Sequence, residues 1–243
     1  MLRARADLLG SGAFAPISDA LITAVRASLR PLTIRDGQHA AGAAPRPLRV
    51  ADLGCGTGHY SAELARAMPE LELLLADRSP DAVRAGLRTL RSATGIVLDI
   101  WRPLPLRTDA ADVILNVFAP RNLEEFARVL RPGGELLVVV PTERHLQELR
   151  REGLVLDIPS GKSAKLVEQF TGAGFTLRSN TQIEYPLEAS GLTRLLLAEM
   201  GPSAHHTDAL ARDDATESPA APDATEPITV SVELLSFELT APA

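Results

Sequence analysis

The sequence contains one cysteine, Cys55, among 243 residues. A single cysteine excludes an internal disulfide framework and a zinc finger, because both need several thiols. Long apolar runs are also missing, since none reaches the ~18–20 residues that a membrane-spanning helix requires. The first ten residues hold two arginines without the apolar run that follows in a secretory signal peptide. These absences predict a cytoplasmic protein that makes no contact with a membrane.

The charge balance does not identify a partner. The net charge is −6, but six acidic residues against one arginine fall between residues 207 and 227. Residues 1–50 carry seven arginines against three aspartates and are locally basic. Binding of nucleic acid is therefore compatible with the charge, and scattered solvated charges are the alternative. The hydrophobic fraction of 45% can fill the core of one large domain, present as a monomer or a homodimer.

The most informative stretch is Val-Ala-Asp-Leu-Gly-Cys-Gly-Thr-Gly at residues 50–58. It follows an apolar run, Leu48–Leu53, and precedes residues 59–68, where apolar side chains recur with helical spacing. The glycines therefore lie on a strand-to-helix turn. Backbone without Cβ can approach a ligand closely there, and the free N–H groups of the helix start face that ligand.

Two acidic residues distinguish this turn from a dinucleotide site. Asp52 lies inside the motif, where it can orient the turn or hold a cationic group such as a sulfonium with an amino-acid tail. The next apolar run ends in Asp77, where a carboxylate can accept both hydroxyls of a ribose. The D-x-G-x-G-x-G pattern of Asp52, Gly54, Gly56 and Gly58 resembles class I S-adenosylmethionine-dependent methyltransferases. A nicotinamide enzyme and a purely structural turn are the alternatives.

Predicted strands and helices alternate through the middle of the chain. Strands are expected at residues 48–53, 71–76, 95–99, 112–117 and 135–140, with helices at 59–68, 79–90 and 122–130 between them. Ser79 and Asn122 are expected to cap the second and third of these helices. This order predicts an α/β fold with a doubly wound, Rossmann-like sheet of five parallel strands.

The flanking regions complete the expected class I methyltransferase architecture. Runs at 175–187 and 228–239 alternate and are expected to form a closing antiparallel strand pair, preceded by helices at 143–151 and 163–171. We expect an N-terminal segment, 1–47, with a helix from Ser18 to Pro31 and a linker at 35–47, and a methyltransferase domain, 48–243. Within that domain, residues 188–227, including a helix at 191–200, form an insertion over the carboxyl ends of the strands, mobile at 203–227.

Several phrases resemble one subfamily, the RlmA-type guanine-N1 methyltransferases of large-subunit rRNA. The lead-in Arg3-x-Arg5-x-x-Leu8-Leu9-x-x-Gly12-x-Phe14-x-Pro16 is similar to the family's lead-in, and Arg144-His-Leu-x-Glu-Leu149 is similar to its R-H-L-x-E-L. Phe118-Ala-Pro120 and Met200-Gly-Pro202 resemble two shorter phrases. This chain departs from the family in lacking a CxxC zinc finger, in having Phe14 where the family has tyrosine, and in having His205 in place of tryptophan.

The resemblance implies S-adenosylmethionine as cofactor and a set of residues that bind it. Gly54, Cys55, Gly56 and Gly58 would contact it and Asp77 its ribose. Asp99 would accept from the adenine amino group, with Ile100 or Trp101 against the ring; a capped loop with Trp101 in the core is the alternative. Asn116 would lie beside the methyl group or satisfy backbone, Phe14 would cover the site or lie in the core, and His145 would contact the cofactor or lie on the surface. No metal site is expected, since adjacent His205 and His206 point different ways.

The resemblance implies methyl transfer to guanine N1 of large-subunit rRNA, with Arg3 and Arg5 expected to contact phosphates. The missing CxxC and the acidic stretch favour an alternative, an N- or O-methyltransferase of small molecules in secondary metabolism. A non-catalytic module that binds S-adenosylmethionine is a third possibility. No residue is identified as the general base from the sequence.

Overall fold

The computed structural model describes residues 2–36, 46–159, 161–200 and 225–240. Seven strands form one sheet in the order β3-β2-β1-β4-β5-β7-β6. Strands β1 to β5 are parallel, β7 runs antiparallel to β5, and β6 runs antiparallel to β7. The strands are β1 (Arg49–Leu53), β2 (Glu72–Asp77), β3 (Thr94–Val97), β4 (Ala111–Val117), β5 (Leu130–Pro141), β6 (Phe175–Ala189) and β7 (Glu226–Leu239). The predicted doubly wound sheet with a closing antiparallel pair is confirmed.

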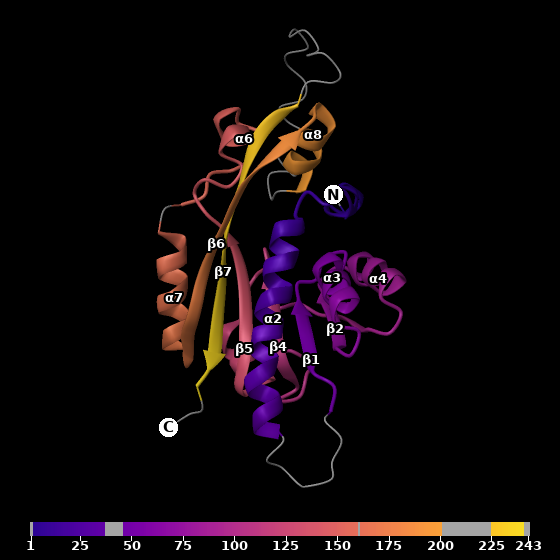
Figure 1. The fold of residues 1–243 in the computed structure, drawn as a ribbon, viewed down its shortest axis with the longest axis vertical. Helices are drawn as coiled ribbons and strands as arrows, with labels where there is room; N and C mark the ends of the chain where they lie inside the picture. Colours follow the sequence, from indigo (N-terminus) through magenta and orange to yellow (C-terminus); the bar gives the residue numbers. More distant parts are fainter. Residues whose placement is uncertain (1, 37–45, 160, 201–224, 241–243) are drawn as a thin grey trace.

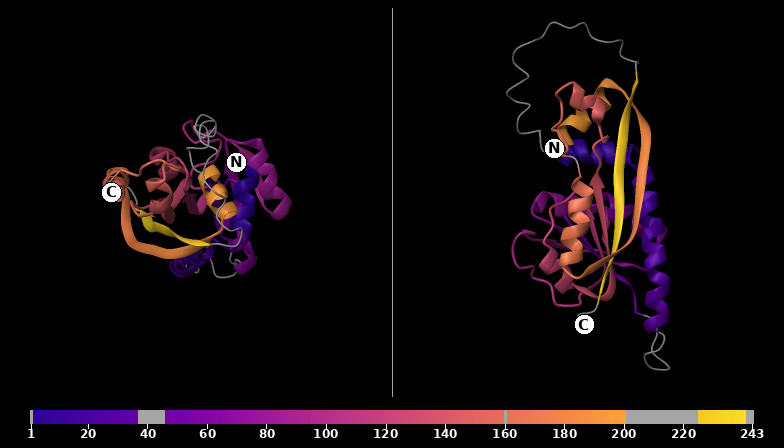
Figure 2. Two further views of the ribbon diagram at one scale, coloured as in Figure 1. Left: turned by 90° about the horizontal axis from the view of Figure 1, so that it is seen from above. Right: turned by 90° about the vertical axis from the view of Figure 1, so that its left-hand side faces the viewer.

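Helices cover both faces of this sheet (Figures 1 and 2). They are α1 (Leu2–Gly10), α2 (Ala15–Asp36), α3 (His59–Ala67), α4 (Pro80–Thr89), α5 (Leu123–Val129), α6 (Gln147–Arg151), α7 (Lys162–Gly172) and α8 (Gly191–Met200). Successive strand residues point to opposite faces. Val113 and Leu115 accordingly share a core with side chains of α2 and α3, whereas Ile114 shares one with α5 and α7. Strands β6 and β7 extend beyond the parallel strands toward α6 and α8 (Figure 1).

Two predicted helix starts are confirmed by their hydrogen bonds. The Ser79 side chain accepts from the backbone N–H of Ala82 at 3.3 Å, with Pro80 at the first helical position of α4. The Asn122 side chain accepts from the N–H of Glu125, also at 3.3 Å, at the start of α5. Both helices start directly after a turn at the carboxyl end of a strand, so the caps help to shape that edge of the sheet.

The N-terminal helix differs from the prediction at both ends. Helix α2 begins at Ala15, because Pro16 suits the first helical turn, and Ser18 is buried beside His59 with 3.5 Å between its Oγ and the ring Nε2. The helix also continues through Pro31 to Asp36, so the loss of one backbone hydrogen bond does not end it. Residues 37–45 of the predicted linker lie outside the described residues.

Three other predicted boundaries were wrong. Strand β3 ends at Val97, since Asp99 already belongs to a turn in which its carbonyl accepts from the N–H of Arg102 at 3.0 Å. Strand β5 begins early, at Leu130, which pairs with Ala111 before a register shift. Helix α6 begins at Gln147, later than residue 143, because Leu146 takes a left-handed φ of 56°.

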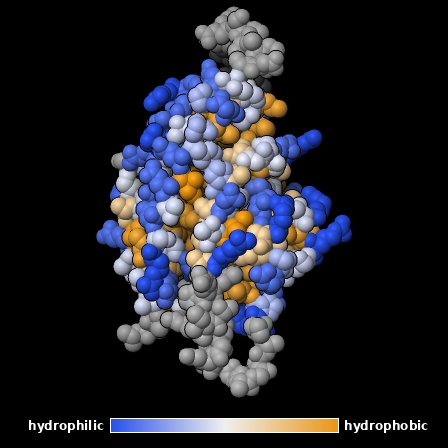
Figure 3. All heavy atoms as spheres, in the orientation of Figure 1, coloured by the Kyte–Doolittle hydropathy of each residue, from blue (hydrophilic) through white to orange (hydrophobic). Residues whose placement is uncertain are grey.

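The face drawn in Figure 3 is mainly hydrophilic, with hydrophobic residues between the hydrophilic ones in separate patches.

No single helix in the described ranges is long and apolar enough to cross a membrane. Helix α1 and residues 15–28 of α2 are long and apolar enough only when they are taken together, and the two are bent by 79° relative to each other. Helix α8 is the described part of the predicted insertion, whereas 201–224, with His205, His206 and most of the acidic stretch, lie outside the described residues.

Candidate active site

The glycine turn joins β1 to α3 at the carboxyl edge of the sheet. The N–H groups of Gly54 and Cys55 both donate to the carbonyl of Ala76, at 2.8 and 2.9 Å, and so hold the turn against β2. Gly54 has φ 95°, and a Cβ at this position would lie 2.3 Å from the Cβ of Ala119. Any side chain at residue 54 would therefore clash with the loop after β4, which explains the requirement for glycine there.

Asp77 lies at the end of β2, where the sequence places it. One carboxylate oxygen accepts from the N–H of Gly56 at 2.9 Å, and the other accepts from the N–H of Ser79 at 2.8 Å. Asp77 therefore fixes the glycine turn as well as the start of α4. Each carboxylate oxygen has a second lone pair, which leaves acceptor capacity at the predicted ribose position.

Asp52 is buried beneath the turn and bonds within the protein. Only 2% of Asp52 is exposed, and its Oδ2 accepts from the hydroxyl of Ser61 in α3 at 2.6 Å. Burial raises the pKa of Asp52 to about 6, although the hydrogen bond from Ser61 lowers it. The charge of Asp77 raises this pKa further, and the charge of Arg5 lowers it. Of the two roles expected for Asp52, the structure shows the one that orients the turn. Burial also raises the pKa of the Cys55 thiol above its ordinary value.

Two buried polar atoms near this turn have no hydrogen-bond partner within the described part of the chain. They are the Tyr60 hydroxyl, at the start of α3, and Oδ1 of Asn116, near the end of β4. The Asn116 amide donates to the carbonyls of Leu53 and Pro120, at 3.1 and 2.8 Å, so the backbone-satisfying role expected for this residue is present. The free amide oxygen leaves room for a second role. Buried unpaired polar atoms are costly, and two of them at one edge of a sheet fit a polar ligand.

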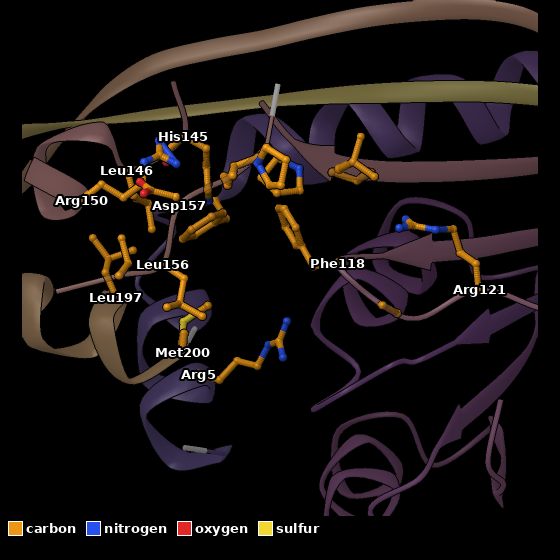
Figure 4. Close-up of a pocket in the computed structure, with 18 residues that line it drawn as sticks. Arg5, Phe118, Arg121, His145, Leu146, Arg150, Leu156, Asp157, Leu197 and Met200 are labelled. Carbon is orange, nitrogen blue, oxygen red and sulfur yellow. The ribbon is translucent and has the colours of Figure 1, made fainter. Parts of the chain in front are cut away.

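A cavity of about 400 Å³ lies close to the turn, with lining residues from α1 and α8 on one side (Figure 4). Phe14, which is 2% exposed, and His145 both line it. Other lining residues come from elements far apart in the sequence: Arg5, Phe118, Arg121, Arg150, Asp157, Leu197 and Met200. The cavity is mainly apolar, with three arginines and one carboxylate at its walls, and Leu197 and Met200 of α8 line one part of it.

His145 is a neutral hydrogen-bond donor. Its Nδ1 accepts from the N–H of Ser231 at 3.2 Å, so the proton of the neutral ring is on Nε2. Burial, together with the charge of Arg150, lowers the pKa of His145 to about 4. The ring stacks on Phe118 with 5.9 Å between the ring centroids and 25° between the planes. At neutral pH, His145 can therefore donate to a ligand but cannot accept a proton from one.

Three residues of this cavity, Phe118, Arg121 and Asp157, were not predicted as parts of the site, whereas Arg5 was expected at its rim, in contact with phosphates. Phe118 takes a left-handed φ of 52° immediately after β4, and backbone strain of this kind is concentrated at functional sites. Arg121 and Asp157 are placed by the loops after β4 and α6, and the turn of Arg5 toward the glycine motif depends on how α1 packs. Only Phe118 left a signal in the sequence, as an aromatic residue that directly follows a buried strand.

The predicted adenine site is only partly assembled. Asp99 follows β3, which lies next to β2, and the N–H of Leu98 donates to the carbonyl of Asp77 at 3.1 Å. The Asp99 carboxylate caps its own loop by accepting from the N–H of Trp101 at 3.1 Å. Ile100 is buried in the core, whereas Trp101 is 67% exposed, so the expectation of Trp101 in the core was wrong. No cluster of three metal-binding side chains occurs among the described residues.

Comparison with known proteins identifies the type of fold and site. Residues 50–134 match the family model described as a methyltransferase domain. The chain is 40% identical to the 23S rRNA (guanine(748)-N(1))-methyltransferase of Streptomyces fradiae, over 86% of this chain and 69% of that protein. It is 38% identical to a candidate 23S rRNA (guanine-N1)-methyltransferase of Micromonospora griseorubida, over 86% and 70%. A solved candidate methyltransferase of Bacillus halodurans has the same fold at 13% identity, with a TM-score of 0.57 over 82% of this chain and 95% of that one.

Proposed function

Since this chain belongs to the RlmA-type family of 23S rRNA (guanine-N1)-methyltransferases, class I enzymes that use S-adenosylmethionine, we propose that it methylates N1 of a guanine in large-subunit rRNA. The observation that supports this best is the juxtaposition of two sites. The glycine turn contacts the loop after β4 at Ala119, and that same loop supplies Phe118 and Arg121 to the cavity. A cofactor on the turn and a base in the cavity would therefore be neighbours.

The residues of the turn fit the proposed cofactor. Gly54, Cys55, Gly56 and Gly58 would lie against it, Asp77 would accept from the ribose, and Asp52 would hold the turn from beneath. The unpaired amide oxygen of Asn116 suits a polar group of the cofactor, and the unpaired Tyr60 hydroxyl is a further donor at this edge. When bound, S-adenosylmethionine supplies a methyl group activated by its sulfonium charge. Asp99, Ile100, Phe14 and His145 complete the proposed set of contacts.

The cavity suits a flipped-out purine. Splayed bases are commonly held by stacking on aromatic side chains and by hydrogen bonds to their Watson–Crick edge. Phe118 offers an aromatic face and His145 an Nε2–H donor, which matches the acceptor O6 of guanine. Arg121 and Arg150 at the walls add positive charge for the phosphates that flank the base.

Methylation at N1 releases the N1 proton, and the cavity restricts which residue can take it. His145 cannot, because its Nδ1 is already occupied by the Ser231 N–H and its ring pKa is low. Asp157 is the carboxylate among the described lining residues. We assign it to accept the N1 proton, or a hydrogen bond from the neighbouring amino group of the guanine. The remaining contribution is positioning, because holding N1 in line with the methyl group supplies much of the rate.

Methyl transfer from labelled S-adenosylmethionine to naked 23S rRNA tests the proposal. We expect 1-methylguanosine in the nucleoside digest, with a rate that falls steeply between ~50 and ~200 mM salt as phosphate contacts weaken. Asp157→Asn should lower the rate by about 10²–10⁴-fold, the usual contribution of a general base. Asp81→Asn, which changes an exposed surface ion pair with Arg84, is the matched control.

One observation favours a second candidate, methylation of a small molecule. The net charge of the sequence is −6, and a negative net charge does not favour binding to the phosphates of RNA. A small-molecule enzyme would not label rRNA at low salt, and a strain lacking the protein would keep all of its rRNA methylguanine. That pair of results would overturn the rRNA proposal while leaving the cofactor assignment intact.

A further inference from the structure

The side chain of Arg5 lies over the glycine turn. A Cβ at Gly56 would be 3.8 Å from Nε of Arg5 and 3.9 Å from its Cζ, so the guanidinium faces the backbone of the motif. Arg5 also lines the cavity (Figure 4), although it comes from α1, outside the matched methyltransferase domain. Its positive charge acts on two buried groups here, since it lowers the pKa of Asp52 and opposes the rise in the pKa of Tyr60.

This guanidinium makes no hydrogen bond or ion pair with any residue in the described ranges. Arg3, two positions earlier on the same helix, is 96% exposed and lies 4.0 Å from Asp7. The two arginines expected to contact phosphates are therefore separated by the fold: Arg3 faces solvent and Arg5 faces the glycine turn. A partly buried guanidinium whose five donors have no partner in these ranges is available to bind an anion.

We propose that Arg5 binds the carboxylate of the amino-acid tail of S-adenosylmethionine, so that the N-terminal helix α1 forms part of the cofactor site. This inference rests on the proposed use of that cofactor. The planar guanidinium matches a carboxylate in a two-point hydrogen-bonded pair. Tyr60 is 7% exposed, and its hydroxyl has no hydrogen-bond partner among the described residues. The charge of Arg5 acts on this hydroxyl, which would be a second donor for the same anion.

The position of Arg5 favours a cofactor carboxylate over an RNA phosphate. The side chain lies against Gly56, a residue of the turn, and its charge acts on Asp52 and Tyr60, which belong to the strand and helix that the turn joins. Because the guanidinium faces the turn, a carboxylate on a ligand bound there would meet it directly.

Calorimetry with two ligands tests the assignment. S-adenosylhomocysteine carries the amino-acid tail, and 5′-methylthioadenosine lacks it. We expect Arg5→Ala to weaken S-adenosylhomocysteine by about 10–150-fold, the range for a lost hydrogen bond to a charged group, and to leave 5′-methylthioadenosine within about 2-fold. Arg5→Lys should recover part of the affinity, and Arg3→Ala, the matched control on the same helix, should bind both ligands as the wild type does.

Three results separate the possible failures. Equal losses for both ligands, or no loss for either, would show that Arg5 does not recognise the carboxylate. If Arg5→Ala does not fold, wild-type binding of decarboxylated S-adenosylhomocysteine decides: affinity equal to that of S-adenosylhomocysteine overturns the proposal, and a loss of about 10-fold or more supports it. If the wild type binds no S-adenosylhomocysteine at all, the proposed function fails first, and the role of Arg5 fails with it.

Discussion

Asp112 and Asp52 are both buried carboxylates in neighbouring strands of one sheet, but their surroundings are opposite. Asp112, at the amino end of β4, is fully buried. Its oxygens accept from two guanidinium nitrogens of Arg46 at 2.7 Å each and from the N–H of Arg49 at 2.8 Å, and Arg131 Nε lies 2.8 Å away. Asp52, toward the carboxyl end of β1, has one side-chain hydrogen bond, from Ser61.

The pKa values of the two carboxyls follow from these surroundings. Burial would raise the pKa of Asp112, but the hydrogen bonds from Arg46 and Arg49 and the charge of Arg131 outweigh it and hold that pKa below its ordinary value. For Asp52, burial prevails and the pKa rises to about 6. The buried carboxylate at the amino edge of the sheet is thus compensated by neighbouring guanidinium groups, whereas the one near the carboxyl edge is poorly compensated. Such an edge is suited to a ligand, and the compensated edge to stability.

The largest effect is expected from Asp112→Ala. Removing the carboxylate leaves several arginines without their shared anion, and breaking a buried ion pair from one side costs about 3–5 kcal/mol. Denaturant unfolding measures the loss. The affinity of the folded fraction for S-adenosylhomocysteine should stay the same. A loss of less than about 1 kcal/mol, the worth of a surface ion pair, would show that the amino edge is not held by this cluster.

Asp52→Asn should have a smaller effect on stability, and of the opposite sign. The pKa of Asp52 in the folded protein lies above its value of 3.8 in the unfolded chain. The contribution of protonated Asp52 to the free energy of unfolding is therefore fully present below pH 3.8 and is lost as the pH rises through about 6. The variant keeps an oxygen for Ser61 but does not titrate. The free energy of unfolding of the variant, relative to that of the wild type, should rise between about pH 4 and 6 by at most ~3 kcal/mol. Unfolding measured as a function of pH checks this. A constant difference across this range would contradict the raised pKa.

Asp77→Ala tests the carboxyl edge through ligand binding. The carboxylate supports the N–H of Gly56 and is the proposed ribose acceptor, so its loss should weaken S-adenosylmethionine by roughly 1.5–3 kcal/mol. Calorimetry on the folded variant provides the value, with Asp81→Ala, an exposed aspartate on α4, as control. An unchanged dissociation constant would remove Asp77 from the site.

The smallest effect is expected from Asp99→Ala. An aspartate at the edge of the site that already caps the N–H of Trp101 can add a single hydrogen bond to adenine, which is worth about 0.5–1.5 kcal/mol. Asp99→Asn, which keeps an oxygen to accept from the N–H of Trp101, serves as the control for a disturbed loop. Wild-type affinity for S-adenosylhomocysteine in Asp99→Asn would assign the loss in Asp99→Ala to the loop and leave adenine unrecognised by the carboxylate.

The same comparison shows what the sequence could predict. The glycine turn, the place of Asp77 at the end of β2 and the alternation of strands and helices depend on local patterns, namely apolar runs, glycines and caps, and these were placed correctly. The Asp112 cluster was missed because Arg46 is 66 positions away and only the fold unites them. For the same reason Asp157 was missed, and Arg5 was expected at the rim of the site and not over the glycine turn, because the packing of α1 and of the loop after α6 is not encoded by local spacing. Helix α2 continues through Pro31 to Asp36, so this local stop signal did not predict the end of the helix.

The most direct test of the contrast between the two edges is backbone hydrogen exchange with and without S-adenosylhomocysteine. The account predicts slower exchange on binding at residues 54–58 and 116–119, at the carboxyl edge, and in α1 around Arg5. Exchange at residues 46–49 and 109–113, around the Asp112 cluster, should not change. Protection at the amino edge, or none at the glycine turn under saturating ligand, would contradict the central claim.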